Sequence, residues 1–163
     1  MNVKTLVGNG ILAALYIAVS MLIQPFGFTN IQFRVSEIFN HLIVFNKKYI
    51  FGMVLGVFLT NLLFSPFPLK FYDLIFGVGQ TIISLLITIA CCRFIKNIWA
   101  RMAVNTLVFT FTMFLIALEL HLAFGWPFMF TWLTTAIGEF IVMAVGMPIM
   151  YALNKRVNFE KAI

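Results

Sequence analysis

The chain has 163 residues, of which 63% are hydrophobic and only 10% are charged, and its net charge is +6. Soluble domains have about 25% charged residues, so a chain this apolar cannot cover a water-facing surface and needs lipid as its solvent. The basic residues are scattered between apolar segments, which favours a role in membrane topology and argues against a nucleic-acid-binding patch. The composition therefore predicts one all-α integral membrane domain over residues 1–163, and no cleavable signal peptide is evident.

The first apolar segment, Leu6–Ile23, is expected to be a membrane-spanning helix. Gly10, Ala14 and Ala18 recur in it every four residues and form a smooth stripe that another helix can approach closely. Such a stripe either packs helices within one chain or docks another subunit, and the sequence alone leaves both interpretations open.

The second segment, Ile31–Phe45, is short for a crossing, which takes about 20 residues. Arg34, Glu37 and His41 have helical spacing in it, so we expect them on one face, and Gln32 pairs with a serine four residues later. Charged side chains at membrane depth normally face a cavity or a partner, so this segment is a candidate binding site. The alternative is an ion pair between Arg34 and Glu37 that only holds helices together.

The third and fourth segments are expected at Tyr49–Phe64, with Asn61 near its end, and at Phe71–Cys92. Polar residues follow one face of the fourth segment, and this pattern predicts a face turned towards a cavity or a neighbouring helix. Asp73, at the start of that face, is either a helix cap or a ligand contact.

The fifth segment is expected at Trp99–Leu122 and the sixth at Phe128–Leu153. Glu119 and His121 near the end of the fifth are expected at the membrane interface. Glu139 lies about 16 Å along the sixth helix, at about 1.5 Å per residue, which places it near mid-membrane. A lone carboxyl group there is protonated, paired or in contact with a ligand.

The distribution of basic residues predicts six crossings with both termini in the cytoplasm, because alternate connections are basic and the others hold only Lys70. The expected cytoplasmic residues are Lys4, Lys47, Lys48, Arg93, Lys96, Arg101, Lys155, Arg156 and Lys161. The polar side chains of the helices then converge on a pocket that opens outward.

Several carboxylates among aromatic residues favour a flat ligand that donates hydrogen bonds or carries positive charge. A guanine-like edge offers two parallel N–H donors, which one carboxylate can accept together. Arg34 or Gln32 can donate to a ring carbonyl, Tyr72, Trp126 or Trp132 can stack on the ring, and a second carboxylate suits an attached amine.

Residues 31–37 read Ile-Gln-Phe-Arg-Val-Ser-Glu, and this run resembles the QFR-x-SE signature of the queuosine-precursor transporter (QueT) family. The resemblance covers nearly the whole chain and continues in the alanine stripe, in Gly56 to Asn61, in Asp73 with Phe76-Gly77 and Thr81, and in Gly138-Glu139. The region around Glu119 and His121 shows no such match.

The family consists of substrate-binding S-components of energy-coupling-factor (ECF) transporters. The resemblance implies a six-helix bundle in the bacterial plasma membrane that binds queuine or another 7-deazaguanine from outside. It also implies docking, through Gly10, Ala14 and Ala18, on a transmembrane coupling subunit that carries two ATPase subunits. The expected substrate-binding side chains are Gln32, Arg34, Glu37, Asn61, Tyr72, Asp73, Trp132 and Glu139.

No cofactor or metal ion is expected, because the adjacent Cys91 and Cys92 suit neither a structural disulfide nor a metal site. The chain also lacks the G-x-x-x-x-G-K-[ST] phosphate loop and is not expected to hydrolyse ATP itself, which fits a subunit powered by a partner. An S-component for another vitamin-like substrate, a small intramembrane enzyme that uses Glu37, His41 or Glu139 as acid or base, and a scaffolding protein without a ligand are the alternatives.

Overall fold

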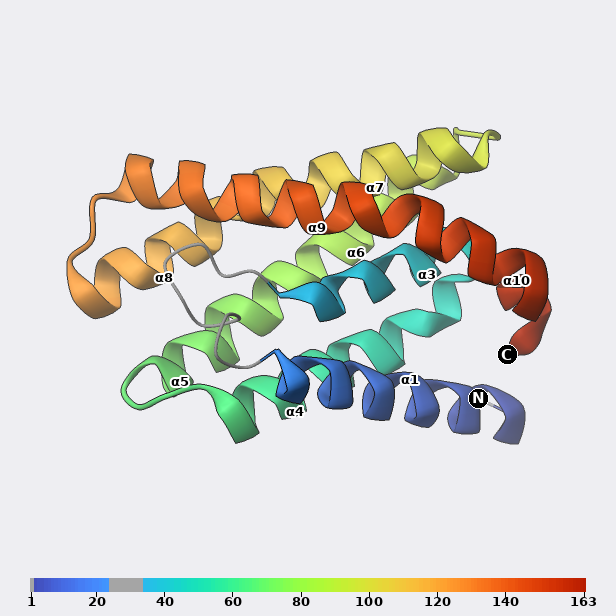
Figure 1. Ribbon diagram of the computed structural model, residues 1–163, viewed down its shortest axis with the longest axis horizontal. Helices are drawn as coiled ribbons and strands as arrows, with labels where there is room; N and C mark the ends of the chain where they lie inside the picture. Colours follow the sequence, from blue (N-terminus) through green and yellow to red (C-terminus); the bar gives the residue numbers. More distant parts are fainter. Residues whose placement is uncertain (1, 24–33) are drawn as a thin grey trace.

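The computed structural model describes residues 2–23 and 34–163, and these residues form a bundle of helices without a strand (Figure 1). The elements are α1 (Val3–Leu22), η1 (Val35–His41), α3 (Leu42–Phe45), η2 (Lys47–Tyr49), α4 (Ile50–Phe64), α5 (Leu69–Tyr72), η3 (Asp73–Gly77), α6 (Val78–Cys92), α7 (Ile98–Thr112), α8 (Phe114–Phe124), α9 (Phe128–Val157) and α10 (Phe159–Ala162).

Five helical stretches are long and apolar enough to cross a membrane. They are Val3–Leu22, Lys47–Phe64, Leu69–Cys92, Ile98–Phe124 and Phe128–Val157. The stretch Val35–Phe45 is apolar but shorter. The chain is therefore an all-α, multi-pass membrane protein, as its composition predicts.

An α-helix is predicted for Ile31–Phe45, but in the described part of this segment only Leu42–Phe45 (α3) is α-helical. η1 is a 3-10 helix, which has 3.0 residues per turn instead of 3.6. Glu37 consequently faces α1, where the Tyr16 hydroxyl donates to it, whereas His41 faces the other way, with Nε2 2.9 Å from a carbonyl oxygen of α9. The prediction that Arg34, Glu37 and His41 share one face is therefore wrong.

The fifth apolar segment was predicted as one helix, and it is divided at Met113 into α7 and α8. The Thr112 hydroxyl donates to the Phe109 carbonyl, 3.0 Å away, directly before the break. A side chain that competes for a helix carbonyl in this way bends the helix. α8 packs against η3 after this bend, and Glu119 points into the bundle.

α1 and α4 form the closest helix pair of the bundle, and two glycines of α4 permit the approach. The Asn9 side chain accepts the Gly52 amide at 2.6 Å. A Cβ atom on Gly52 would lie 2.7 Å from the Asn9 carbonyl oxygen, and one on Gly56 would lie 2.9 Å from Tyr16 Cβ. The face of α1 that packs internally is thus the one that carries Asn9 and Tyr16.

Replacement of Gly52 by alanine is expected to destabilise the chain by about 1–3 kcal/mol, because the new methyl group meets backbone atoms of α1 that cannot rotate away. The matched control is Gly79→Ala in α6, where a Cβ atom meets nothing within 4 Å and alanine is the better helix former. Thermal unfolding in detergent measures both. A Gly52→Ala variant as stable as the control would contradict the close α1–α4 contact.

The polar face of α6 is turned towards α7, in agreement with the inward orientation predicted from the sequence. Ser84 and Gln80 both bond to the Thr112 hydroxyl, at 2.7 and 3.0 Å. Further along, Thr88 donates to Asn105, and the Asn105 amide lies 3.2 Å from His41 Nδ1. Because Nε2 of His41 meets the α9 carbonyl, both ring nitrogens serve helix packing and neither is left for acid–base chemistry.

Both chain ends lie at the same end of the bundle (Figure 1). Lys4 Nζ donates to the Lys161 carbonyl at 2.6 Å, and the Ile163 side chain packs against Gly8. The α6–α7 connection, with Arg93 and Lys96, is at this end too (Figure 1). The basic residues assigned to one side of the membrane therefore gather at one end of the fold.

Candidate functional site

A buried polar cluster surrounds Arg34, which directly precedes η1. The guanidinium forms an ion pair with Asp73, 3.1 Å between Nη2 and Oδ1. Its charge also interacts with the carboxyl groups of Glu37, Glu119 and Glu139, each of which is no more than 5% exposed. The chain has five acidic residues, and all of them except Glu160 belong to this cluster.

Glu37 is held between α1 and its own helix. The Tyr16 hydroxyl donates to one carboxylate oxygen, and the Asn40 amide donates to the other. A bond of 2.7 Å between Ser20 and Ser36 ties the same two elements together one turn away. The orientation of the Glu37 carboxyl group therefore depends directly on the position of α1.

Asp73 begins η3, a π-helical turn between α5 and α6. Such turns widen the backbone and occur frequently at functional sites. The Asn61 amide of α4 donates to the Asp73 backbone carbonyl at 3.0 Å and fixes this turn. A Cβ atom on Gly77 would lie 2.8 Å from the Asn61 amide nitrogen and 3.6 Å from Asp73 Oδ1, so glycine leaves room for both groups.

Several buried polar atoms of the cluster have no hydrogen-bond partner among the described residues. They are Glu139 Oε1, Asn61 Oδ1 and Asn40 Oδ1, whereas the carboxyl groups of Glu119 and Asp73 hydrogen-bond to each other. Each such atom costs about 1–3 kcal/mol, and folded proteins leave few of them. Their concentration around one guanidinium indicates a place where a polar ligand binds.

The cluster brings together five of the predicted site residues, from the η1 segment, α4, η3 and α9: Arg34, Glu37, Asn61, Asp73 and Glu139. Gln32 lies outside the described residues. Tyr72 is half-buried and packs instead against an apolar group around Leu69, Met113, Ile116 and Leu120.

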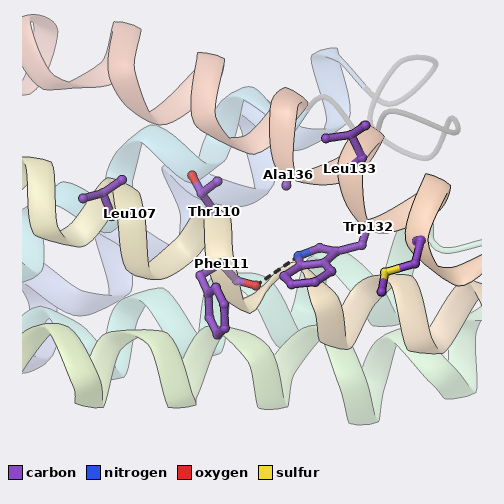
Figure 2. A pocket seen from close by; sticks show the side chains of 7 residues that line it. Leu107, Thr110, Phe111, Trp132, Leu133 and Ala136 are labelled. Atoms are coloured by element: carbon purple, nitrogen blue, oxygen red, sulfur yellow. Dashed lines mark hydrogen bonds between the residues drawn. The ribbon is translucent and has the colours of Figure 1, made fainter.

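Trp132 occupies a groove of about 580 Å³ between α7 and α9. Figure 2 shows its indole N–H directed at the Phe111 carbonyl, to which it donates at 3.2 Å. Its ring also packs edge-on against Phe111, with 5.7 Å between ring centres. The groove is otherwise lined almost entirely by apolar side chains, so the structure places Trp132 in an apolar setting; its role in stacking on a substrate stays a prediction.

Sequence reasoning missed Tyr16 and Asn40, and it placed Glu119 at the membrane interface. Glu119 is 0% exposed and therefore points into the bundle, while its depth in the membrane stays a prediction. The sequence did contain a signal for the inward orientation of Glu119. Asn105, Thr112 and Glu119 are spaced by seven residues, which places them on one helix face, and all three are buried. His121, by contrast, is exposed, and its side chain is not part of the buried cluster. Its Nδ1 donates to the Trp126 carbonyl at 2.7 Å.

The arrangement suits recognition of a polar organic molecule. One guanidinium and several amide or carboxyl oxygens offer donors and acceptors in a region shielded from lipid. Across the described ranges, no three His, Cys, Asp or Glu side chains are grouped so that they would hold a metal ion.

Comparison with known proteins gives a consistent result. The model of a family described as "QueT transporter" matches residues 6–155. A protein of Lactococcus lactis subsp. cremoris (strain MG1363), described as "Queuosine precursor transporter QueT", is 34% identical over 160 residues, which cover 93% of this chain and 92% of that protein. No solved structure matches the chain.

Proposed function

The chain belongs to the QueT transporter family, as its QFR-x-SE run predicts, and from this premise we propose that it is the substrate-binding S-component of an ECF transporter for a queuosine precursor. Members of this family are transporters and not enzymes. The occupation of both His41 ring nitrogens by helix packing agrees with that assignment.

The proposed substrate is queuine or another 7-deazaguanine, and the buried acidic cluster around Arg34 is the observation that supports it. A carboxylate can accept both N–H groups of a guanine-like edge, while a guanidinium can donate to the ring carbonyl. The proposed substrate-binding residues are Gln32, Arg34, Glu37, Asn61, Tyr72, Asp73, Trp132 and Glu139.

The proposed partners are a transmembrane coupling subunit and two ATPase subunits, as the family membership implies, and the lack of a phosphate-binding loop in the sequence fits a subunit powered by a partner. Gly10, Ala14 and Ala18 are all exposed on α1, on the face opposite to its contact with α4, and a Cβ atom on Gly10 would meet nothing within 4 Å. The stripe therefore does not pack helices within the described chain. We assign it to docking of the coupling subunit.

The proposed topology has six crossings in the bacterial plasma membrane, with residues 31–45 as the second. Both termini then lie in the cytoplasm, in accordance with the positive-inside rule and with the gathering of basic residues at the terminal end of the bundle (Figure 1). In this proposed topology the Arg34 cluster, to which η1, η3, α8 and α9 contribute, is reached from the outer side of the membrane.

The direct test is thermal unfolding of the purified chain in detergent with a panel of ligands: queuine, 7-aminomethyl-7-deazaguanine, 7-cyano-7-deazaguanine, guanine, biotin, riboflavin and thiamine. A ligand that binds only the folded state raises the unfolding temperature. We expect a shift with 7-deazaguanines and none with biotin, riboflavin or thiamine. A shift with one of those vitamins alone would overturn the proposed substrate, and no shift with any compound would overturn the binding function.

A further inference from the structure

The terminal end of the bundle carries positive charge that the protein itself does not balance. All basic residues except Arg34 and Lys70 lie there, on α1, η2, the α6–α7 connection, the start of α7 and the segment from the end of α9 to α10 (Figure 1). Glu160 is the one acidic residue of this end, because the other four belong to the buried Arg34 cluster. This end is therefore complementary in charge to an anionic surface.

The last turn of α9 reaches the level of the lipid headgroups. The helix has 30 residues, which at about 1.5 Å per residue extend over about 45 Å. The hydrocarbon core of a bilayer is about 30 Å thick, and the headgroups extend it to about 40–45 Å. Lys155 lies in the last turn of α9 and thus beside the phosphate groups of one leaflet.

Trp99, Tyr151 and Lys155 form a stack at this level. The ring centres of Trp99 and Tyr151 are 4.8 Å apart, and the Lys155 ammonium lies 4.8 Å from the centre of the Tyr151 ring, a cation–π contact. Tyr151 is half-buried and packs against the hydrophobic core, so its ring is a fixed support. The support orders a long side chain before any ligand arrives, which lowers the entropy cost of binding.

The Lys155 ammonium is available to an acceptor from outside the chain. It is exposed and has no hydrogen-bond or ion-pair partner among the described residues. Arg101 nearby is already engaged, because its Nε donates to the Ile95 carbonyl at 2.6 Å. The first turn of α7 is capped by the Asn97 side chain, which accepts the Trp99 amide at 2.8 Å. Among these groups, the ammonium on the Tyr151 ring is the one that offers free donors.

We propose that Trp99, Tyr151 and Lys155 form a binding site for the headgroup of an anionic phospholipid. The Lys155 ammonium donates to the phosphate, and the Trp99 ring, 41% exposed, packs against the glycerol and the first acyl carbons. Phosphatidylglycerol fits this site because its headgroup has a net negative charge. In phosphatidylcholine the same phosphate is balanced by a trimethylammonium group. The inference is independent of the transported substrate.

Native mass spectrometry of the purified full chain in detergent, titrated with the two lipids carrying identical acyl chains, tests the site. Wild type is expected to bind the first phosphatidylglycerol roughly five- to tenfold more tightly than the first phosphatidylcholine, the effect of one lysine at an anionic headgroup. Lys155→Gln is expected to lose most of this preference, and Lys155→Arg is expected to keep it.

The matched control is Lys70→Gln, which removes the same charge away from the terminal end and should leave the preference within about twofold of wild type. Equal losses in Lys155→Gln and Lys70→Gln would show a response to net charge alone and would overturn the site. Equal affinity of wild type for both lipids would overturn it without any variant. Displacement of phosphatidylglycerol by inorganic phosphate at equal concentration would assign the stack to a soluble anion and not to a lipid.

Discussion

Replacement of Arg34 by methionine is expected to abolish substrate binding and to destabilise the chain by about 3–5 kcal/mol, the usual cost of removing one partner from a buried ion pair. Arg34 supplies the positive charge around which four carboxyl groups are buried. Its guanidinium forms the ion pair with Asp73 Oδ1. Methionine has a similar length and no charge, so the variant tests the charge and not the volume.

A double variant separates the two effects of this change. In Arg34→Met/Asp73→Asn the orphaned carboxylate is removed as well, so part of the lost stability should return while substrate binding stays absent. Thermal unfolding measures the first quantity and calorimetric titration the second. An Arg34→Met chain that binds a 7-deazaguanine with wild-type affinity would rule out the cluster as the substrate site.

Ala14→Trp is expected to abolish uptake of the substrate in cells and to prevent assembly with the coupling subunit, while the isolated chain binds substrate normally. Ala14 is exposed in the middle of the stripe of small residues on α1, and a bulky ring there keeps another helix at a distance. The residue faces away from Asn9 and Tyr16, which make the internal contacts of α1.

The matched control is Leu86→Trp on α6, where the replaced side chain is 53% exposed to lipid and lies on a helix other than α1. Uptake assays in cells and co-purification with the coupling subunit should show normal behaviour for this variant. Ala14→Trp with normal uptake would remove the stripe as the docking face, and Ala14→Trp with lost substrate binding would show that this position supports the site instead.

The sequence was sufficient for the class of protein and for most helix positions. Turns that contain Pro or Gly mark the ends of α4 and α8 and the start of α9, and Gly125 with a φ of +71° ends α8 as a left-handed cap. Four residues that share the buried cluster, Arg34, Glu37, Asp73 and Glu139, drew attention in the sequence because a charged residue is conspicuous in an apolar run, and their role in substrate binding stays a prediction.

Other features depend on how far each side chain is rotated about its helix axis and on contacts between residues far apart in the sequence. The sequence pattern shows neither. The 3-10 geometry of η1 rotates Glu37 and His41 to opposite partners, although an α-helical count places them together. The bend at Met113 turns Glu119 inward. The partnership of Tyr16 with Glu37 joins residues 21 positions apart on different helices, and no periodic pattern reveals such a contact.

α1 presents the stripe of Gly10, Ala14 and Ala18 to the outside and the hydroxyl of Tyr16 to Glu37 on its inner face. Any displacement of this helix by a docked partner therefore also moves the group that orients Glu37. Thermodynamic linkage makes this connection reciprocal: the factor by which docking changes substrate affinity equals the factor by which substrate changes the affinity of docking. A single helix is thus enough to connect substrate binding with docking on the proposed coupling subunit.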